Sequence, residues 1–353
     1  ERVIAILSDY LVHQNCDVSI IVLNRLNNQQ SLNPEIKIIT LNQNKVLSSF
    51  FPLRSLLKKN KYDFIIGNMW PITILGLAAS FLSFKKLNVL FIEHSIISNE
   101  YNHQSFAFQH IVKLSIRLFY NFSSQIICVS NGVANDLKKL GVKKSKLKVI
   151  LNPVDIHPKL NERNDYDQHA LHWKDFAGIK ILSVGNLRKN KNYPNLLKSL
   201  KILRDKYNQD FISLIAGDGP EKDSLRSMIA EYSLENQVIL LGGVQYTQSL
   251  YRNADLFVLS SDYEGFGMVL VEALGYGKTI VATDCESGPR EILGNSQYGY
   301  LCLADNPEKL AESIYDAYLN KLSPDTLLER YKDFDISLIG KKYLSLMQSI
   351  KSD

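Results

Sequence analysis

Short apolar runs alternate with helix-like segments along most of this chain, and the alternation occurs in two series. In the first series we expect strands at residues 17–23, 36–40, 62–66, 88–92 and 125–129. In the second series we expect them at 179–184, 211–216, 237–241, 255–259 and 279–282. Apolar strands separated by helices are typical of a parallel sheet covered on both faces. The pattern therefore predicts an α/β protein with two Rossmann-like domains in tandem.

A polar stretch at residues 155–178 separates the two series and is predicted to be a linker or a long surface loop. The chain has 353 residues, which is enough for two domains of ordinary size. We expect domains at 1–155 and 156–330, with a ligand in the cleft between them. Residues 331–353 are predicted to be a C-terminal helix, which either closes the second domain or crosses back to the first. A weak break is expected at 333–335.

Cysteine usage and hydropathy indicate a cytoplasmic protein without a metal site. The four cysteines, Cys16, Cys128, Cys285 and Cys302, are scattered and form no CxxC pair. The longest uncharged apolar run, at 71–84, is too short to cross a bilayer and is predicted to be a buried helix.

Charge is distributed unevenly, although the net charge is only +5. Residues 1–155 contain 18 Lys and Arg against 9 Asp and Glu, a net charge of +9, and the remainder carries −4. A basic half favours an anionic partner, whereas the alternative is a set of solvated lysines on helix faces. No RNA- or DNA-binding motif accompanies these residues, so nucleic acid is not expected as a partner.

Residues 50–61 interleave apolar and cationic side chains within this basic half. Such a segment suits an anionic membrane surface or a lipid diphosphate. The alternative is an ordinary amphipathic helix packed on its sheet. We expect a peripheral enzyme at the inner face of the cytoplasmic membrane.

Two glutamates, Glu264 and Glu272, follow the expected strand at 255–259. Glu264 precedes a Gly-Phe-Gly turn, and Glu272 is expected about two turns along the next helix. The amides of Gly267, Met268 and Val269 would lie at the start of that helix, where free N–H groups and the helix dipole attract anions. Carboxylates beside an anion site favour a nucleotide-sugar, although both could simply be solvated helix-end acids.

A second loop with ligand-binding chemistry follows the expected strand at 179–184. It contains Gly185, Asn186, Arg188 and Lys191. A glycine after a strand, followed by cations before a helix, is a phosphate-binding arrangement. The alternative is a charged surface turn.

Two further loops follow strands. Gly217, Gly219 and Pro220 come after 211–216, and His94 comes after 88–92. Alone, the first is more often a tight turn, and a lone histidine is more often structural. Four loops at the carboxyl ends of separate strands nevertheless carry groups suited to one ligand.

With these motifs in this order, the chain resembles the retaining glycosyltransferases of family 4, which have the GT-B fold. The matching segments are 1–4, 93–95, 129–133, 152–155, 185–191, 217–220, 264–277 and 287–293. The resemblance implies two Rossmann-like domains facing a central cleft that binds a nucleotide-sugar.

The resemblance also implies roles for individual residues. Glu272 would bind the ribose, and Glu264 would contact the donor sugar. Lys191, with a nearby Arg, would neutralise the departing diphosphate, and His94 would face the donor sugar from the other domain. The remaining donor-binding positions would be Gly185, Asn186, Gly217, Gly219, Pro220, Leu241, Gly267, Met268 and Val269.

The sequence departs from the family in two places. Asn186 stands where the family often has Arg, so Arg188 is expected to supply that charge. The family also has a strand and a Gly-Gly loop before the segment equivalent to 1–4. We therefore expect about 15–20 further residues ahead of Glu1 in the intact protein.

The resemblance implies transfer of a hexose or N-acetylhexosamine from a UDP-sugar, with retention, to a lipid-linked glycan. The product would belong to capsule, lipopolysaccharide or a glycoprotein glycan. No metal or other cofactor is expected. By resemblance alone, residues 287–291 incline the choice of sugar toward N-acetylgalactosamine or galactose. The alternative function is a nucleotide-sugar-binding subunit without turnover, serving a partner transferase.

Overall fold

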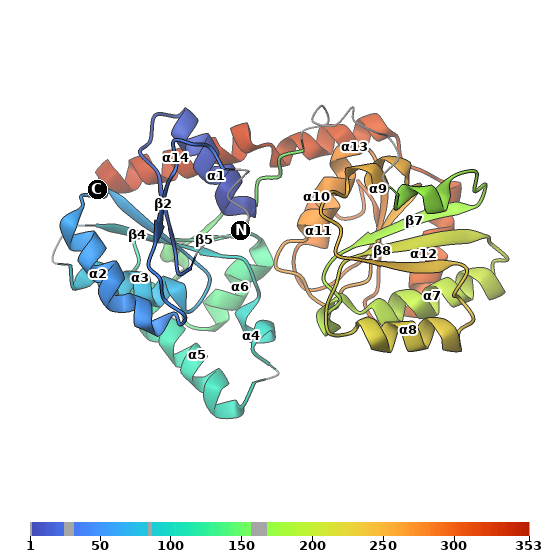
Figure 1. Ribbon diagram of the computed structural model, residues 1–353, viewed down its shortest axis with the longest axis horizontal. Helices are drawn as coiled ribbons and strands as arrows, with labels where there is room; N and C mark the ends of the chain where they lie inside the picture. Colours follow the sequence, from blue (N-terminus) through green and yellow to red (C-terminus); the bar gives the residue numbers. More distant parts are fainter. Residues whose placement is uncertain (1, 25–31, 84–86, 103, 157–167, 353) are drawn as a thin grey trace. The chain divides into compact units, whose positions relative to one another are not determined.

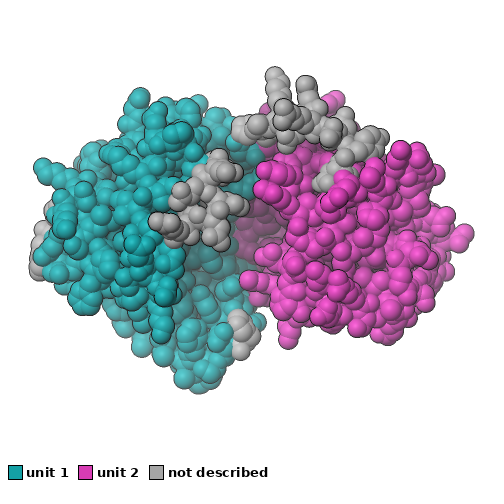
Figure 2. Space-filling model, viewed as in Figure 1, with its two compact units in different colours: residues 1–155, 334–353 teal, residues 156–333 magenta. Residues whose placement is uncertain are grey.

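The chain forms two compact units, which Figure 2 shows in different colours. The structure is a computed structural model that describes residues 2–24, 32–83, 87–102, 104–156 and 168–352. Unit 1 comprises residues 1–155 and 334–353, and unit 2 comprises residues 156–333. The last residues of the chain therefore belong to the same unit as the first.

Unit 2 is built on six parallel strands in the order β12-β11-β10-β7-β8-β9. Numbered within the unit, this is the 3-2-1-4-5-6 order of the Rossmann fold, read from the opposite edge. The strands are all parallel, and the order in which they are added reverses between β7 and β10, which are neighbours in the sheet. The strands are β7 Ile179–Val184, β8 Phe211–Ala216, β9 Val238–Gly242, β10 Leu256–Leu259, β11 Thr279–Thr283 and β12 Tyr300–Cys302.

Helices cover both faces of this sheet (Figure 1). On one face, α7, α8 and α12 contribute apolar side chains to a single core with the strands. On the other face, α10 packs against β10 and β11, and α9 packs against β7. Because both faces are covered, every residue of β10 and β11 is buried. The helices are α7 Tyr193–Asp205, α8 Lys222–Glu231, α9 Gln248–Asn253, α10 Met268–Gly275, α11 Pro289–Ile292, α12 Pro307–Leu319 and α13 Pro324–Tyr331.

Unit 1 contains a four-stranded parallel sheet in the order β3-β4-β5-β6 and a parallel pair, β1-β2. Its strands are β1 Ser19–Val22, β2 Lys37–Thr40, β3 Phe64–Asn68, β4 Asn88–Glu93, β5 Gln125–Cys128 and β6 Leu147–Val149. Its helices are α1 Arg2–His13, α2 Phe50–Lys59, α3 Ile72–Phe81, α4 Ile97–Glu100, α5 Phe106–Phe119, α6 Asn131–Lys139 and α14 Ile336–Ser352. Helix α14 packs on α1, where Gly340 lies against the ring of Tyr10.

Helix α2 is the segment in which apolar and cationic residues alternate, and its apolar side belongs to the core. Leu53 and Leu57 are buried and pack with Leu75 and Ala79 of α3. Only Phe51 remains as a large exposed apolar side chain on α2. The alternative of an ordinary packed helix is therefore correct for this segment.

The predicted α/β class and both strand series are confirmed. The structure differs from the prediction in adding short strands at weakly apolar segments. The strands β6 and β12 were not predicted, because each has three residues and neither is a continuous buried run. The predicted break at 333–335 is confirmed as a short 3-10 turn, Lys332–Phe334, between α13 and α14. Within the predicted polar connection, Ala170–Trp173 form a 3-10 turn, and 157–167 lie outside the described residues.

Candidate functional site

The two charged loops of unit 2 meet where the order of strands along the sheet reverses. The loop after β7 carries Lys191, and the loop after β10 carries Glu264. Because β7 and β10 are hydrogen-bonded neighbours, their carboxyl ends place these loops side by side. Ligands of open α/β sheets bind at this switch point.

Lys191 and Glu264 form a largely buried ion pair. The Nζ of Lys191 lies 2.6 Å from Oε1 of Glu264, and the side chains are 18% and 9% exposed. Ser261 donates its hydroxyl to the same oxygen at 2.6 Å, and Ser260 donates to the backbone carbonyl of Lys191 at 2.8 Å. These contacts hold the Lys191 side chain in one conformation. The side chain would therefore lose little conformational entropy when it binds a phosphate.

Arg188 and Asn186 lie in the same loop, and both side chains are exposed. A backbone hydrogen bond joins them, from the N–H of Arg188 to the carbonyl of Asn186 at 2.8 Å. Arg188, the predicted second cation, thus precedes Lys191 in the same loop, and its side chain is exposed to solvent. Its part in binding a diphosphate stays a prediction.

The Gly-Phe-Gly turn leads into α10. Gly267 caps this helix at φ 92°, in the left-handed region that favours glycine. The amides of Gly267, Met268 and Val269 lie at a helix start, where N–H groups have no acceptor within the helix. The predicted helix start is therefore confirmed, and binding of an anion there stays a prediction.

The loop after β11 supports this turn from the other side. Ser287 donates its hydroxyl to the carbonyl of Gly265 at 3.1 Å. A Cβ on Gly288 would lie 2.1 Å from the carbonyl oxygen of Phe266, so only glycine fits there. The Ser-Gly-Pro segment thus packs on the Gly-Phe-Gly turn, and its link to the choice of sugar stays a prediction.

Glu272 is buried in α10 and accepts a hydrogen bond from the hydroxyl of Tyr251 at 3.0 Å. Tyr251, on α9, is itself buried and stacks on Tyr276 with ring centroids 5.3 Å apart and planes 4° from parallel. This tyrosine was missed by sequence reasoning, because an aromatic residue in a short helix gives no signal of what its hydroxyl contacts. It fixes the direction in which Glu272 presents its carboxylate.

The glycines after β8 serve loop packing. A Cβ on Gly217 would lie 1.9 Å from the carbonyl oxygen of Gly185, and one on Gly219 would lie 2.4 Å from that of Leu187. These close contacts hold the loops after β7 and β8 together. Pro220 and Leu241 lie at the same end of the sheet, after β8 and within β9. Contact of these residues with a nucleotide base stays a prediction.

His94 follows β4 in unit 1 and makes a contact of 3.3 Å between its Nε2 and Oδ1 of Asn68. Burial lowers the pKa of His94 to about 4, so the ring is neutral at physiological pH. A neutral imidazole can both donate and accept a hydrogen bond, which suits contact with sugar hydroxyls. Its predicted role toward a donor sugar remains untested.

Glu93 lies next to His94 and ends β4. It is fully buried, and the hydroxyl of Tyr120 donates to its Oε1 at 2.5 Å. Its other oxygen, Oε2, has no hydrogen-bond partner in the described part of the chain. Burial raises the pKa of Glu93 to about 8, and the charge of Asp136 adds to this shift. Glu93 is therefore mostly protonated at neutral pH.

We expect Glu93 to make unit 1 less stable as the pH rises from 6.5 to 8. Its folded-state pKa is raised, so the stabilisation is complete below the unfolded pKa near 4.5 and is lost as the pH approaches 8. In the unfolded chain His94 titrates near pH 6.5 and contributes with the opposite sign, so the slope due to Glu93 is read between pH 7 and 8, where His94 is largely neutral in both states. The free energy of unfolding should fall by roughly 1 kcal/mol per pH unit, and Glu93→Gln should remove the slope. Trp70 fluorescence during urea unfolding, in a Trp173→Phe background, reports on unit 1 alone. An unchanged slope in Glu93→Gln would contradict this assignment.

Two family models match this chain, one over each half. The model described as glycosyl transferases group 1 matches residues 174–334, and the model described as glycosyltransferase family 4 matches residues 1–157. The chain belongs to the group 1 glycosyltransferases of the family 4 type.

Relatives of this glycosyltransferase include two transferases of Campylobacter jejuni. One is named GalNAc-α-(1→4)-GalNAc-α-(1→3)-diNAcBac-PP-undecaprenol α-1,4-N-acetyl-D-galactosaminyltransferase. It is 25% identical over 100% of this chain and 95% of its own length. The other is named N-acetylgalactosamine-N,N'-diacetylbacillosaminyl-diphospho-undecaprenol 4-α-N-acetylgalactosaminyltransferase. It is 31% identical over 63% of this chain and 57% of its own length.

Solved structures confirm the GT-B class for this glycosyltransferase. HepE of Anabaena, in complex with UDP and glucose, has a TM-score of 0.80 at 20% identity, covering 99% of this chain and 95% of that one. The apo form of the lipopolysaccharide outer core galactosyltransferase WaaB has a TM-score of 0.74 at 20% identity, with the same coverage.

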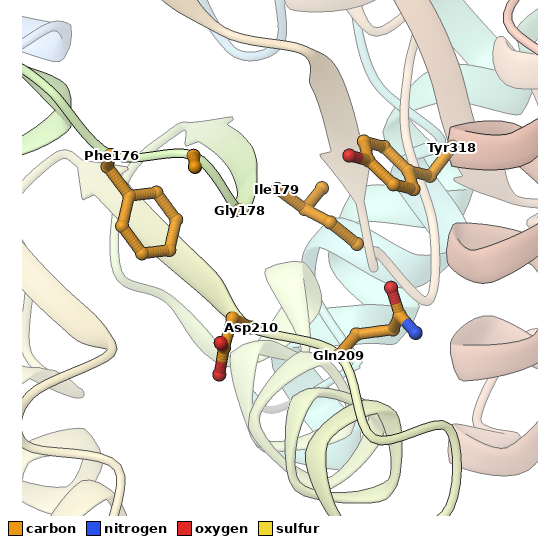
Figure 3. Close-up of a pocket in the computed structure, with 7 residues that line it drawn as sticks. Phe176, Gly178, Ile179, Gln209, Asp210 and Tyr318 are labelled. Carbon is orange, nitrogen blue, oxygen red and sulfur yellow. The ribbon is translucent and has the colours of Figure 1, made fainter.

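A separate cavity of about 460 Å³ in unit 2 lies away from this site. Phe176, Gly178, Asp210 and Tyr318 line it, as Figure 3 shows. It opens at the residues that precede β7 and β8, which is the amino end of the sheet. The charged loops of the glycosyltransferase lie at the carboxyl end, so this cavity is not the donor site.

Among the described residues, no group of three or more His, Cys, Asp or Glu side chains is placed to hold a metal ion. Within the same residues, no helix combines the length and apolar character that a membrane span requires.

Proposed function

We propose that this glycosyltransferase moves a hexose or N-acetylhexosamine from a UDP-sugar to a lipid-linked glycan, with retention of the α configuration. The observation that carries the proposal is the Lys191–Glu264 pair at the switch point of unit 2, beside the start of α10. A cation and helix amides suit a diphosphate, and carboxylates suit the hydroxyls of a sugar and a ribose.

Each part of the donor has a matching group in unit 2. Glu272, oriented by Tyr251, would accept hydrogen bonds from the ribose hydroxyls. The amides of Gly267, Met268 and Val269 would hold the phosphate, and Glu264 would contact the sugar. The assignment explains why both carboxylates are buried yet tied to hydrogen-bond donors.

The chemical step that we propose breaks the bond between the anomeric carbon and the phosphate oxygen. The acceptor hydroxyl attacks the same face of an oxocarbenium-like sugar, and its proton passes to the leaving phosphate. Lys191, with Arg188, would stabilise the negative charge that develops on the diphosphate. In this scheme the protein's own cations take that role, and no cofactor is required.

The names of the relatives support the proposed acceptor and sugar. Both Campylobacter jejuni proteins are named for transfer of N-acetylgalactosamine to undecaprenol diphosphate-linked acceptors. The HepE structure, with UDP and glucose, supports UDP as the nucleotide. We place the reaction at the inner face of the cytoplasmic membrane, in synthesis of a surface polysaccharide or glycan.

A panel of UDP-sugars with an undecaprenyl diphosphate-linked acceptor tests the proposal, scored by UDP release. We expect UDP release to be fastest with UDP-N-acetylgalactosamine or with UDP-galactose. NMR of the product should show an α linkage. A β product would refute retention. Binding of UDP without turnover of any donor would instead favour a non-catalytic subunit that serves a partner transferase.

A further inference from the structure

Helix α5 exposes large apolar side chains to solvent along its whole length. Ala107, Ile111, Leu114 and Leu118 recur at intervals of four, three and four residues, which places them on one side of the helix. Ile111 is 60% exposed, Leu114 is 56% exposed and Leu118 is 51% exposed. The opposite side of α5 is anchored in unit 1 by the buried Val112 and Ile116. The exposed side is therefore not needed for the fold of α5.

Neighbouring elements extend this apolar surface. Phe81 ends α3 and Phe122 follows α5, and their rings meet edge to face with centroids 6.3 Å apart. The two side chains are 59% and 64% exposed. Figure 1 shows α5 projecting beyond the four-stranded sheet of unit 1. Contiguous exposed apolar residues of this kind mark an interaction surface.

Cationic residues flank this surface. Residues 106–122 contain no Asp or Glu, and Lys113 and Arg117 are both exposed next to the apolar side. A second group lies between 138 and 148, where six of eleven residues are lysine: Lys138, Lys139, Lys143, Lys144, Lys146 and Lys148.

Hydrogen bonds fix the lysine-rich segment beside the end of α5. Asn121 donates through Nδ2 to the carbonyls of Arg117 and Gly141, each at 3.2 Å. Its Oδ1 accepts from the backbone N–H of Lys143 at 2.9 Å. The apolar side of α5 and the lysines therefore form one continuous feature of unit 1. We call it the α5 surface, comprising the exposed residues of 106–122 and 138–148 with Phe81.

We propose that the α5 surface docks on an anionic lipid bilayer. Apolar side chains beside a band of lysines, without acidic residues, match acyl chains next to negative headgroups. A second copy of the chain is a poorer occupant, because two such cationic surfaces would repel each other. The proposal deepens the proposed function by locating the contact with the membrane that would hold a lipid-linked acceptor. It replaces the predicted contact through α2.

Vesicle flotation tests the α5 surface with two variants. The apolar variant combines Ile111→Gln, Leu114→Gln and Leu118→Gln, and the charge variant combines Lys138→Gln, Lys143→Gln and Lys144→Gln. The matched control combines Leu171→Gln, Leu319→Gln and Leu328→Gln, which change exposed leucines of unit 2. Circular dichroism confirms that each protein is folded.

We expect the wild-type chain and the control to float with phosphatidylglycerol-containing vesicles and much less with pure phosphatidylcholine. Each surface variant should bind the anionic vesicles at least about tenfold more weakly. Equal flotation of the apolar variant and the wild type would overturn the proposal. So would a wild-type dimer in light scattering that the apolar variant converts to a monomer, because the surface would then join two copies.

Donor hydrolysis without lipid separates this proposal from the proposed function. Both surface variants should release UDP from the preferred donor at the wild-type rate, since the changed residues belong to unit 1 and none of them is a proposed donor-binding residue. Vesicle binding without any donor turnover would leave the α5 surface standing and refute the transferase assignment.

Discussion

Replacing Lys191 with alanine is expected to lower kcat by about 10²- to 10³-fold, which is typical for loss of one group that stabilises charge in a transition state. The cation would face the diphosphate as it departs, so its removal should affect the chemical step more than donor binding. Initial rates of UDP release over a range of donor concentrations separate kcat from KM.

The fold should survive this change. Glu264 keeps the hydroxyl of Ser261 as a donor at 2.6 Å, and the rest of the loop is held by backbone contacts. Lys189→Ala is the matched control, because Lys189 lies in the same 3-10 turn and is exposed. If Lys191→Ala turned over at nearly the wild-type rate, the assignment of the donor site would be wrong.

Replacing Glu272 with alanine is expected to weaken UDP binding by about 10- to 100-fold, as expected for loss of hydrogen bonds to a charged group. The ribose would lose its acceptor, whereas the helix amides at the start of α10 would remain. Isothermal titration calorimetry with UDP measures the change directly. The effect should appear in the donor KM with a smaller change in kcat.

Two variants separate a direct role of Glu272 from a structural one. Glu272→Gln keeps the shape of the side chain and an acceptor oxygen, so it should retain part of the affinity. Tyr251→Phe removes the 3.0 Å hydrogen bond that orients the carboxylate, and it should weaken UDP binding less than Glu272→Ala. Wild-type affinity for UDP in Glu272→Ala would rule out contact with the ribose.

Sequence reasoning located strands best where they are buried on both faces. The runs at 179–184 and 211–216 coincide with β7 and β8, because a central parallel strand must be apolar throughout. The short strands β6 and β12 lack this signal. Helix α2 shows where sequence patterns do not decide. Its apolar residues are equally typical of a helix on a membrane surface and of a helix packed on the core.

Within the site, residue types could be predicted but partners could not. The glutamates, the lysine and the glycine turn are visible as motifs, and each follows a strand. Nothing in the sequence states that Ser261 and Lys191 share one oxygen of Glu264, or that Tyr251 orients Glu272. These contacts join residues up to 73 positions apart, and chain separation carries no information about distance in space.

By itself, the sequence determined the fold class, the two strand series and the chemical character of the loops, because periodicity and residue type are local properties. The tertiary structure alone decided that β7 and β10 are neighbours, and hence that Lys191 meets Glu264. It also decided which apolar faces are covered: the leucines of α2 pack against α3, while those of α5 remain in solvent. Strand order and burial depend on how distant segments pack, and no local pattern specifies that.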